Sequence, residues 1–448
     1  MSIFKRLFAV LLVAGSSSCM SAYHLQPAEK RLGTDRGLDR DYHEVATDPQ
    51  GAGLRMPGFL LGVEKTQVRL IDAPRWDAIE ALNSNPDGVS PRITGKFRSV
   101  TNDPKRMFLS HLVEYRLALT PTPYIEVDFL HDAYGRDPRR GSAAELELTE
   151  SAYADSWRAL DVLHDRIRTR LDIAVANGEP YTHLVFATMG WHTRQLEGLR
   201  DLNSLFGNLL HAAREAEVDS FRPLFVGMTW PSDWTVKVVS YANKANDADE
   251  LGFGLVNALT HNVLCRLRDS MPMEAPKVVL IGHSFGARIV TRAAFSRAFL
   301  RDVRSDRGPD LVLSLQGAFS LNRFIEGGGL EGAPYANHEG QAPTVAMTWS
   351  DSDTANPLTR FVTGAVNSGS KGGFKLAQKH QGLFSFGTST ATGELRGVPA
   401  TVGVPERLMI DASELIRFTP PGTGGGSHSD IFNRYIGRLI WQVFERYE

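Results

Sequence analysis

The sequence predicts an α/β fold with a mainly parallel sheet and helices on both faces. From about residue 180, short uninterrupted apolar runs alternate with segments of helical periodicity. An uninterrupted run indicates a strand that is buried on both faces, which is typical of parallel sheets. The expected strands are at 184–187, 224–228, 278–281, 311–315, 344–347 and 408–410. Buried strands separated by helices therefore indicate a core at 180–448.

Residues 56–179 are expected to form an N-terminal extension to this core. Strand-like runs occur at 67–71 and 124–129, between turn-rich segments. Helical spacing at 148–176 predicts a long helix. The apolar positions expected on one of its faces are Leu160, Leu163, Ile167, Leu171 and Ile173.

Composition excludes several classes of protein. The chain has 448 residues, is 42% hydrophobic and 22% charged, and carries a formal charge of −2. Such a balance is that of a globular protein and provides no field to attract nucleic acid. Its two cysteines exclude a disulfide framework and a cysteine-rich metal site, and no cofactor or metal is expected. Cys265 lies in an apolar periodic stretch and is expected to pack as a small hydrophobe.

The N-terminus predicts a targeting segment at 1–19. Lys5 and Arg6 precede a short apolar run at 7–15, and small residues then lead to Cys19. A cysteine after small residues resembles the lipobox of bacterial lipoproteins, although Ser16 stands where an aliphatic residue is usual. We expect Cys19 to be lipidated and the protein to face the periplasm from the bacterial envelope, with residues 20–55 as a tether. A plain secretory signal, giving a periplasmic or secreted protein, is the alternative.

Two further segments bear on the site. Residues 366–404 are rich in Gly, Ser and Thr and are expected to form a loop or lid. Residues 282–286 read Gly-His-Ser-Phe-Gly, directly between a predicted strand and a predicted helix at 287–300. In a strand–turn–helix context, Ser284 would project from the carboxyl end of the sheet on a strained turn that both glycines permit. This context identifies Ser284 as the candidate nucleophile.

A serine hydroxyl needs a general base, and the base needs an orienting acid. Three histidines follow Ser284, namely His338, His380 and His428. Only His428 follows the last predicted strand, on a Gly-rich loop that can return to the nucleophile. We therefore expect His428 to be the base and Ser284, acid and His428 to follow one another along the chain.

The acid is expected after the strand at 344–347, where Asp351 and Asp353 both stand. One of them would orient the imidazole and the other would cap the next helix. Asp411, after the last strand, is a third candidate. Two carboxylates alone do not indicate a metal site, because no histidine or cysteine cluster accompanies them.

An oxyanion hole needs two N–H donors. Phe285, directly after the nucleophile, would supply one donor. The other is expected from Trp191, after Gly190, which lets the backbone approach the substrate. Trp191 and Trp230 could each pack in the core or line an acyl pocket.

With these residues in place, the chain resembles the α/β-hydrolase superfamily and, within it, a group of bacterial serine hydrolases of esterase or lipase type. The resemblance covers roughly residues 180–448. It implies a Ser-Asp-His triad and favours Asp353 over Asp351. The motifs that carry it are Gly190-Trp191, Trp230-Pro231-Ser232, the serine motif at 282–286, Asp353-Thr354-Ala355, Asp411-Ala412-Ser413 and Ser427-His428-Ser429. Met189 departs from this pattern, because the family has a histidine before the oxyanion glycine.

The expected activity is hydrolysis of a carboxylic ester, from a small molecule or a lipid, through an acyl-enzyme. Acyl transfer and peptidase activity use the same residues and stay open. An alternative is a catalytically silent envelope lipoprotein of the same fold that binds a lipid or a protein partner.

Overall fold

The computed structural model describes the chain in segments. They comprise residues 45, 48, 51–65, 107–118, 123–133, 152–190, 193–232, 241–271, 275–297, 300, 303–305, 307–326, 335, 342–355, 366–398, 406–419 and 426–447. The strands are β1 Gly58–Lys65, β2 Met107–Ala118, β3 Tyr124–Asp132, β4 His183–Thr188, β5 Pro223–Thr229, β6 Lys277–His283, β7 Leu311–Leu315, β8 Thr344–Trp349, β9 Ser385–Ser389, β10 Leu395–Arg396 and β11 Arg407–Asp411. The helices are α6 Ala152–Ala176, α7 Gln195–Glu215, α8 Tyr241–Phe253, α9 Leu255–Ala258, α10 Arg266–Asp269, α11 Phe285–Phe295, α13 Lys371–Lys379 and α14 Arg434–Arg446. A π-helical stretch covers Leu259–Cys265, and short 3-10 turns cover Leu321–Phe324 and Ser427–Ser429.

All described strands belong to one sheet of 11 strands, in the order β10-β9-β11-β8-β7-β6-β4-β5-β1-β2-β3. From β9 to β1 every neighbouring pair is parallel, whereas β2 pairs antiparallel with β1 and β3, and β10 with β9. The mainly parallel α/β fold is thus confirmed, with all six strands expected after residue 180 present.

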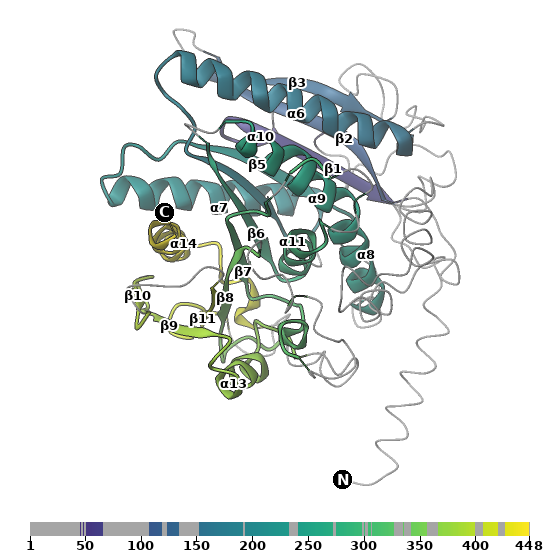
Figure 1. The fold of residues 1–448 in the computed structure, drawn as a ribbon. Coiled ribbons are helices and arrows are strands. Elements are labelled where there is room, and N and C mark those ends of the chain that lie inside the picture. Colours follow the sequence, from purple (N-terminus) through teal and green to yellow (C-terminus); the bar gives the residue numbers. More distant parts are fainter. Residues whose placement is uncertain are drawn as a thin grey trace.

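Helices cover both faces of the sheet (Figure 1). On β4, Leu184 and Phe186 point into the core layer shared with α6, α8, α9 and α11. Val185 and Ala187 point into the layer shared with α7 and α14. Because successive side chains of a strand alternate between faces, a strand covered on both sides must be apolar throughout. This requirement explains the uninterrupted apolar runs.

The N-terminal extension completes the sheet. The strand expected at 124–129 is β3, the expected long helix is α6, and the run at 67–71 lies outside the described residues. β1 and β2, which the pattern did not predict, lie between β5 and β3, and β1 is the last strand of the parallel part. Leu160, Leu163 and Leu171 are buried on α6, with Ile167. Ile173 is 56% exposed, because its position falls outside this face of the helix.

Two connecting segments are more ordered than their composition suggested where the structure describes them. At the end of the expected tether, Val45, Ala52 and Leu54 are buried, and the Val45 N–H donates to Gln195 Oε1 of α7 over 3.1 Å. Three apolar side chains against α7 outweigh the polar composition that suggested a tether. The expected loop at 366–404 instead carries α13, β9 and β10, and β9 pairs with β11. Strand pairing there satisfies backbone groups, which a run of small residues allows despite its loop-like composition.

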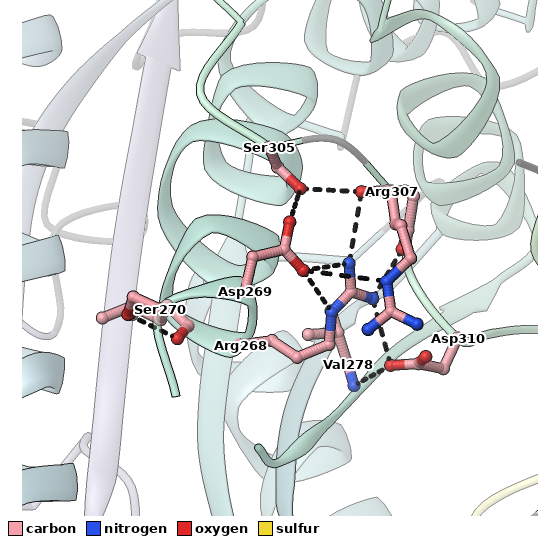
Figure 2. A network of polar contacts seen from close by, with 9 residues as sticks. Arg268, Asp269, Ser270, Val278, Ser305, Arg307 and Asp310 are labelled. Carbon is pink, nitrogen blue, oxygen red and sulfur yellow. Dashed lines mark hydrogen bonds and ion pairs between the residues drawn. The ribbon is translucent and has the colours of Figure 1, made fainter. Parts of the chain in front are cut away.

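A network around Arg268 of α10 lies where the parallel strands begin, at the amino ends of β6 and β7 (Figure 2). We call this side of the sheet the amino edge, and the side where the parallel strands end the carboxyl edge. Arg268 is 2% exposed, and its guanidinium pairs with Asp269 at 2.8 Å and with Asp310 at 3.3 Å. Asp310 in turn accepts the N–H of Val278 at the start of β6. Ser305 donates to Asp269 Oδ2 over 2.6 Å. The network therefore ties the loop before β7 to the amino end of β6.

Cys265 is fully buried in the layer beneath α9 and α11, as expected of a small hydrophobe. Burial raises the pKa of its thiol to about 12. The side chain therefore packs as a neutral group.

Candidate active site

Ser284 occupies a tight turn between β6 and α11. Its backbone has φ 57° and ψ −117°, a conformation that costs free energy for any residue except glycine. Two hydrogen bonds to the end of β7 hold it. The Ser284 N–H donates to the Leu315 carbonyl oxygen, and the Ala318 N–H donates to the Ser284 carbonyl oxygen, both over 3.0 Å. The turn is therefore set by the neighbouring strand as well as by its own sequence.

The glycines on either side of Ser284 are required by space, as the sequence predicted. A Cβ on Gly282 would lie 2.3 Å from the carbonyl carbon of Gly286. A Cβ on Gly286 would lie 2.2 Å from the carbonyl oxygen of Thr188, at the end of β4. The second contact shows that Gly286 also lets α11 approach the loop after β4.

The backbone of Gly190 lies against the nucleophile. A Cβ at this position would come within 2.5 Å of Ser284 Cβ and 3.1 Å of Ser284 Oγ. Phe285 is the first residue of α11, so its N–H points out of the helix N-terminus beside Ser284. Trp191, the other expected oxyanion donor, lies outside the described residues.

The loop after β5 supports the loop that carries Gly190. Trp230 is 3% exposed, and its indole N–H donates to the Met189 carbonyl oxygen over 2.9 Å. Ser232 Oγ donates to the Thr193 carbonyl oxygen over 2.8 Å and accepts the Thr193 N–H over 3.1 Å. Of the two alternatives for Trp230, the structure shows a buried side chain. Trp230 and Ser232 thus hold the backbone on both sides of Gly190, a role that the sequence did not predict.

Asp353 and His428 meet at the carboxyl ends of β8 and β11, which are neighbours in the sheet. The distance from His428 Nδ1 to Asp353 Oδ2 is 2.8 Å. Asp353 is 3% exposed, and its Oδ1 accepts the Ala355 N–H over 2.9 Å. A bridge between Asp353 and Gly426 joins the two loops through their backbones.

The other candidates for base and acid lie elsewhere. Asp351 is exposed, and Asp411 accepts the N–H of Ser413 in the turn after β11. Neither carboxylate contacts His428. His380 ends α13, and His338 lies outside the described residues. Asp351 and Asp353 stand two residues apart in the same loop after β8, and in the structure Asp351 is exposed whereas Asp353 is buried against His428.

The loop that carries His428 is closed by Asp430. Its carboxylate accepts the N–H groups of Phe418 and Thr419 over 2.7 and 2.8 Å. Ser427 Oγ donates to the Thr419 carbonyl oxygen over 2.9 Å. These hydrogen bonds hold residues 418 and 419 beside residues 427 and 430 and so fix the position of His428.

His283 connects this loop to the nucleophile turn. Its Nε2 donates to the backbone carbonyl oxygen of His428 over 3.0 Å, and the two rings are 4.9 Å apart. Burial lowers the pKa of His283 to about 3, and the neighbouring His428 contributes in the same direction. His283 is thus a neutral donor. Ser284 Oγ and His428 make no hydrogen bond to each other in the described part of the chain, a contact that often tightens only when substrate binds.

Gln316 is a further residue at this edge that the sequence did not single out. It is fully buried directly after β7 and donates from Nε2 to Asp353 Oδ2 over 3.1 Å. Its place at the carboxyl end of a buried parallel strand is the signal that could have identified it.

The site lies where the strand order of the sheet reverses. After β4 the chain passes to β5 on one side, and then to β6 on the other side of β4. Open α/β sheets bind ligands at such a switch point, at the carboxyl ends of the strands. Gly190 after β4 and Ser284 after β6 flank it.

Within the ranges described, no three His, Cys, Asp or Glu side chains are grouped so that they could hold a metal ion. None of the helices in those ranges has both the length and the apolar character needed to cross a membrane.

Comparison with known proteins identifies no family for the chain. No protein-family model matches the chain, and no curated protein matches it. Among solved structures, the chain is similar to a lipase-esterase related protein from Clostridium acetobutylicum, at 10% identity and a TM-score of 0.25, over 60% of this chain and 95% of that one. It is also similar to a metagenomic carboxyl esterase, at 14% identity and a TM-score of 0.22, over 59% and 75% of the two chains. At these scores neither likeness bears on the site, whose interpretation rests on its geometry.

Proposed function

We propose that the protein is a serine hydrolase of the α/β-hydrolase type that cleaves carboxylic esters through an acyl-enzyme. Ser284 is the nucleophile, His428 the base and Asp353 the acid. One observation carries the proposal: a strained serine turn, with a glycine backbone against its Oγ, lies at the switch point of the sheet beside the hydrogen-bonded pair of buried Asp353 and partly buried His428. Backbone strain that persists in a folded protein is concentrated at functional sites.

The proposed reaction follows from these positions. Ser284 Oγ attacks the carbonyl carbon of the ester while His428 Nε2 takes the hydroxyl proton. Asp353 keeps Nδ1 protonated and stabilises the imidazolium that forms. His428 then gives its proton to the departing alcohol. A water molecule, deprotonated by His428, then attacks the acyl carbon. The bond from this carbon to Ser284 Oγ breaks, His428 returns its proton to Oγ, and the carboxylic acid leaves.

The charge that develops on the carbonyl oxygen needs donors that are already oriented. Phe285 N–H at the start of α11 supplies one, and the partial positive charge of the helix N-terminus adds to it. We assign the second donor to Trp191 N–H, after Gly190. Trp230 and Ser232 support this assignment because they hold the loop that contains both residues.

Location is a separate part of the proposal. The motif that ends at Cys19 supports a lipid anchor on the bacterial envelope, and residues 1–44 lie outside the described part of the chain. Metabolic labelling with a radioactive fatty acid should mark the wild-type protein. A Cys19→Ala variant that is still labelled would contradict the anchor.

A fluorophosphonate probe tests the activity, because it reacts only with an activated serine. The folded wild-type protein should be labelled and should hydrolyse p-nitrophenyl esters. Ser284→Ala should abolish labelling and lower kcat by about 10⁴-fold or more. Ser270→Ala, a serine after α10 at the opposite edge of the sheet, is the matched control and should keep both. Folded wild-type protein that is neither labelled nor active would instead favour a lipoprotein that only binds a lipid or a protein. A panel of esters of graded acyl length would then define the substrate.

A further inference from the structure

We propose that Gln316 is a positioning residue for the Asp353–His428 pair, an inference that rests on the proposed function. Gln316 follows β7 and reaches Asp353, which follows β8. Its Nε2 donates to Asp353 Oδ2 over 3.1 Å, and His428 Nδ1 meets the same oxygen at 2.8 Å. Gln316 therefore acts on the base through the acid.

A lock formed with Thr348 sets the orientation of the Gln316 side chain. Thr348 Oγ1 accepts the backbone N–H of Gln316 over 3.0 Å and donates its own proton to Gln316 Oε1 over 3.2 Å. A hydroxyl has one proton, and a carboxylate only accepts. With Oε1 held by Thr348, only the NH₂ group can face Asp353. A flipped amide would place its oxygen against the carboxylate.

The backbone of Gln316 adopts a conformation that costs free energy in a non-glycine residue. Its φ is 49°, in the left-handed region that glycine adopts without strain. A glycine at this position would relax the backbone but would remove the side chain that links Thr348 to Asp353. Gln316, Thr348 and Asp353 are all at least 97% buried, because their exposed fractions are 0%, 1% and 3%. A strained backbone that carries a buried amide of fixed orientation is consistent with a residue whose position serves the site.

The consequence for the pair is geometric and electrostatic. The donors that reach the Asp353 carboxylate include His428, Gln316 and the Ala355 backbone. Without the Gln316 donor, the orientation of the carboxylate against Nδ1 is less restricted, which should lower kcat. The charge of the carboxylate is also less neutralised, so it holds the proton on His428 more strongly. The acid limb of the kcat/KM profile should then move to higher pH, because His428 must be neutral to act as base.

Gln316→Gly is the decisive variant, because it removes the side chain and relieves the backbone at the same time. Relief of the positive φ should offset part of the stability lost with the buried side chain, so we expect the variant to stay folded, as its thermal midpoint would show. We expect kcat to fall roughly tenfold with KM unchanged, and the acid limb to rise by roughly half a pH unit. A merely structural role would leave the acid limb in place.

Thr348 provides an independent test of the lock. Thr348→Val keeps the shape and removes the hydroxyl, so it should reproduce the same changes at a smaller size. Thr348→Ser restores the hydroxyl and should return the acid limb to its wild-type position. Gln316→Gly or Thr348→Val with wild-type kcat and pH profile would overturn the proposal.

An NMR signature separates failure of this proposal from failure of the proposed function. The proton between His428 Nδ1 and Asp353 should give a far-downfield ¹H resonance, assigned by its loss in Asp353→Asn. If the wild type has no activity, the proposed function fails, but a shift of this resonance in Gln316→Gly would still support positioning. An unshifted resonance would overturn the positioning role.

Discussion

The amino edge and the carboxyl edge of the sheet both carry buried polar networks, yet they differ in how each is held. At the amino edge, Arg268 pairs with two carboxylates and donates to the carbonyl oxygen of Gly308 over 2.7 Å. Opposite charges and ordinary backbone geometry satisfy this network (Figure 2). At the carboxyl edge, Ser284 and Gln316 have positive φ angles, two of the three non-glycine residues with this property in the described chain.

This difference shows where the fold accepts strain. A network whose only role is structural can relax to its lowest free energy. A network that must hold a nucleophile and an acid–base pair in one arrangement cannot, and its strain is compensated by packing elsewhere. The carboxyl edge also coincides with the switch point of the strand order. The comparison therefore supports a stabilising role at one edge and a chemical role at the other.

The largest effect is expected from the acid. Asp353→Asn should lower kcat by about 10⁴-fold, because an amide can no longer stabilise the imidazolium and favours the wrong tautomer. Asp351→Asn, two residues away and exposed, is the matched control and should stay near wild type. Hydrolysis of a p-nitrophenyl ester by both variants measures the difference. Equal losses of activity in the two variants would contradict the assignment of Asp353, rather than Asp351, as the acid.

The next largest effect is expected at Gly190. Gly190→Ala places a Cβ 2.5 Å from Ser284 Cβ, so the loop or the nucleophile must move. A displacement of this kind should lower kcat/KM by about a hundredfold. Gly207→Ala adds a Cβ in α7 with no heavy atom within 4 Å, and it should leave activity unchanged. Wild-type activity in Gly190→Ala would show that the loop does not form part of the site.

A change at the amino edge should affect stability and spare activity. Arg268→Met removes the buried cation that pairs with both Asp269 and Asp310 and should lower the free energy of unfolding by about 3 kcal/mol. Urea unfolding gives this value, and kcat/KM per folded molecule should be unchanged. A fall in kcat/KM of the folded variant would mean that the two edges are coupled.

The smallest effect near neutral pH concerns His183, at the start of β4, because its contribution grows only as the pH falls. Burial lowers its pKa to about 4, and its ring stacks on Phe444. The unfolded chain binds a proton near pH 6.5 and the folded protein does not, so stability falls as pH drops from about 6.5 to 4, by roughly 1.4 kcal/mol per unit at most. His183→Phe should flatten the free energy of unfolding over this window. An unchanged slope would assign the acid sensitivity to other groups, with His283 at the carboxyl edge as the first to examine.

Much of the fold followed from the apolar pattern. Strands buried on both faces leave a signal that needs no tertiary context, and all six appear where the pattern placed them. β1 and β2 were missed because they lie among turn-rich segments. Composition also misled at 366–398. The small residues there suggested a loop, but part of this segment forms β9, which pairs with β11. Strand pairing depends on a partner that is distant in sequence, and local composition does not record it.

The sequence by itself determined the local parts of the candidate site. The glycines around Ser284 and the strand–turn–helix context are properties of adjacent residues, so they could be read directly. The tertiary structure alone decided which carboxylate meets His428, that His283 holds the base loop, and that Gln316 reaches Asp353. Each of these contacts joins residues from different strand ends, between 37 and 145 positions apart. Only folding brings such side chains within hydrogen-bond distance, and their geometry depends on how neighbouring strands lie in the sheet.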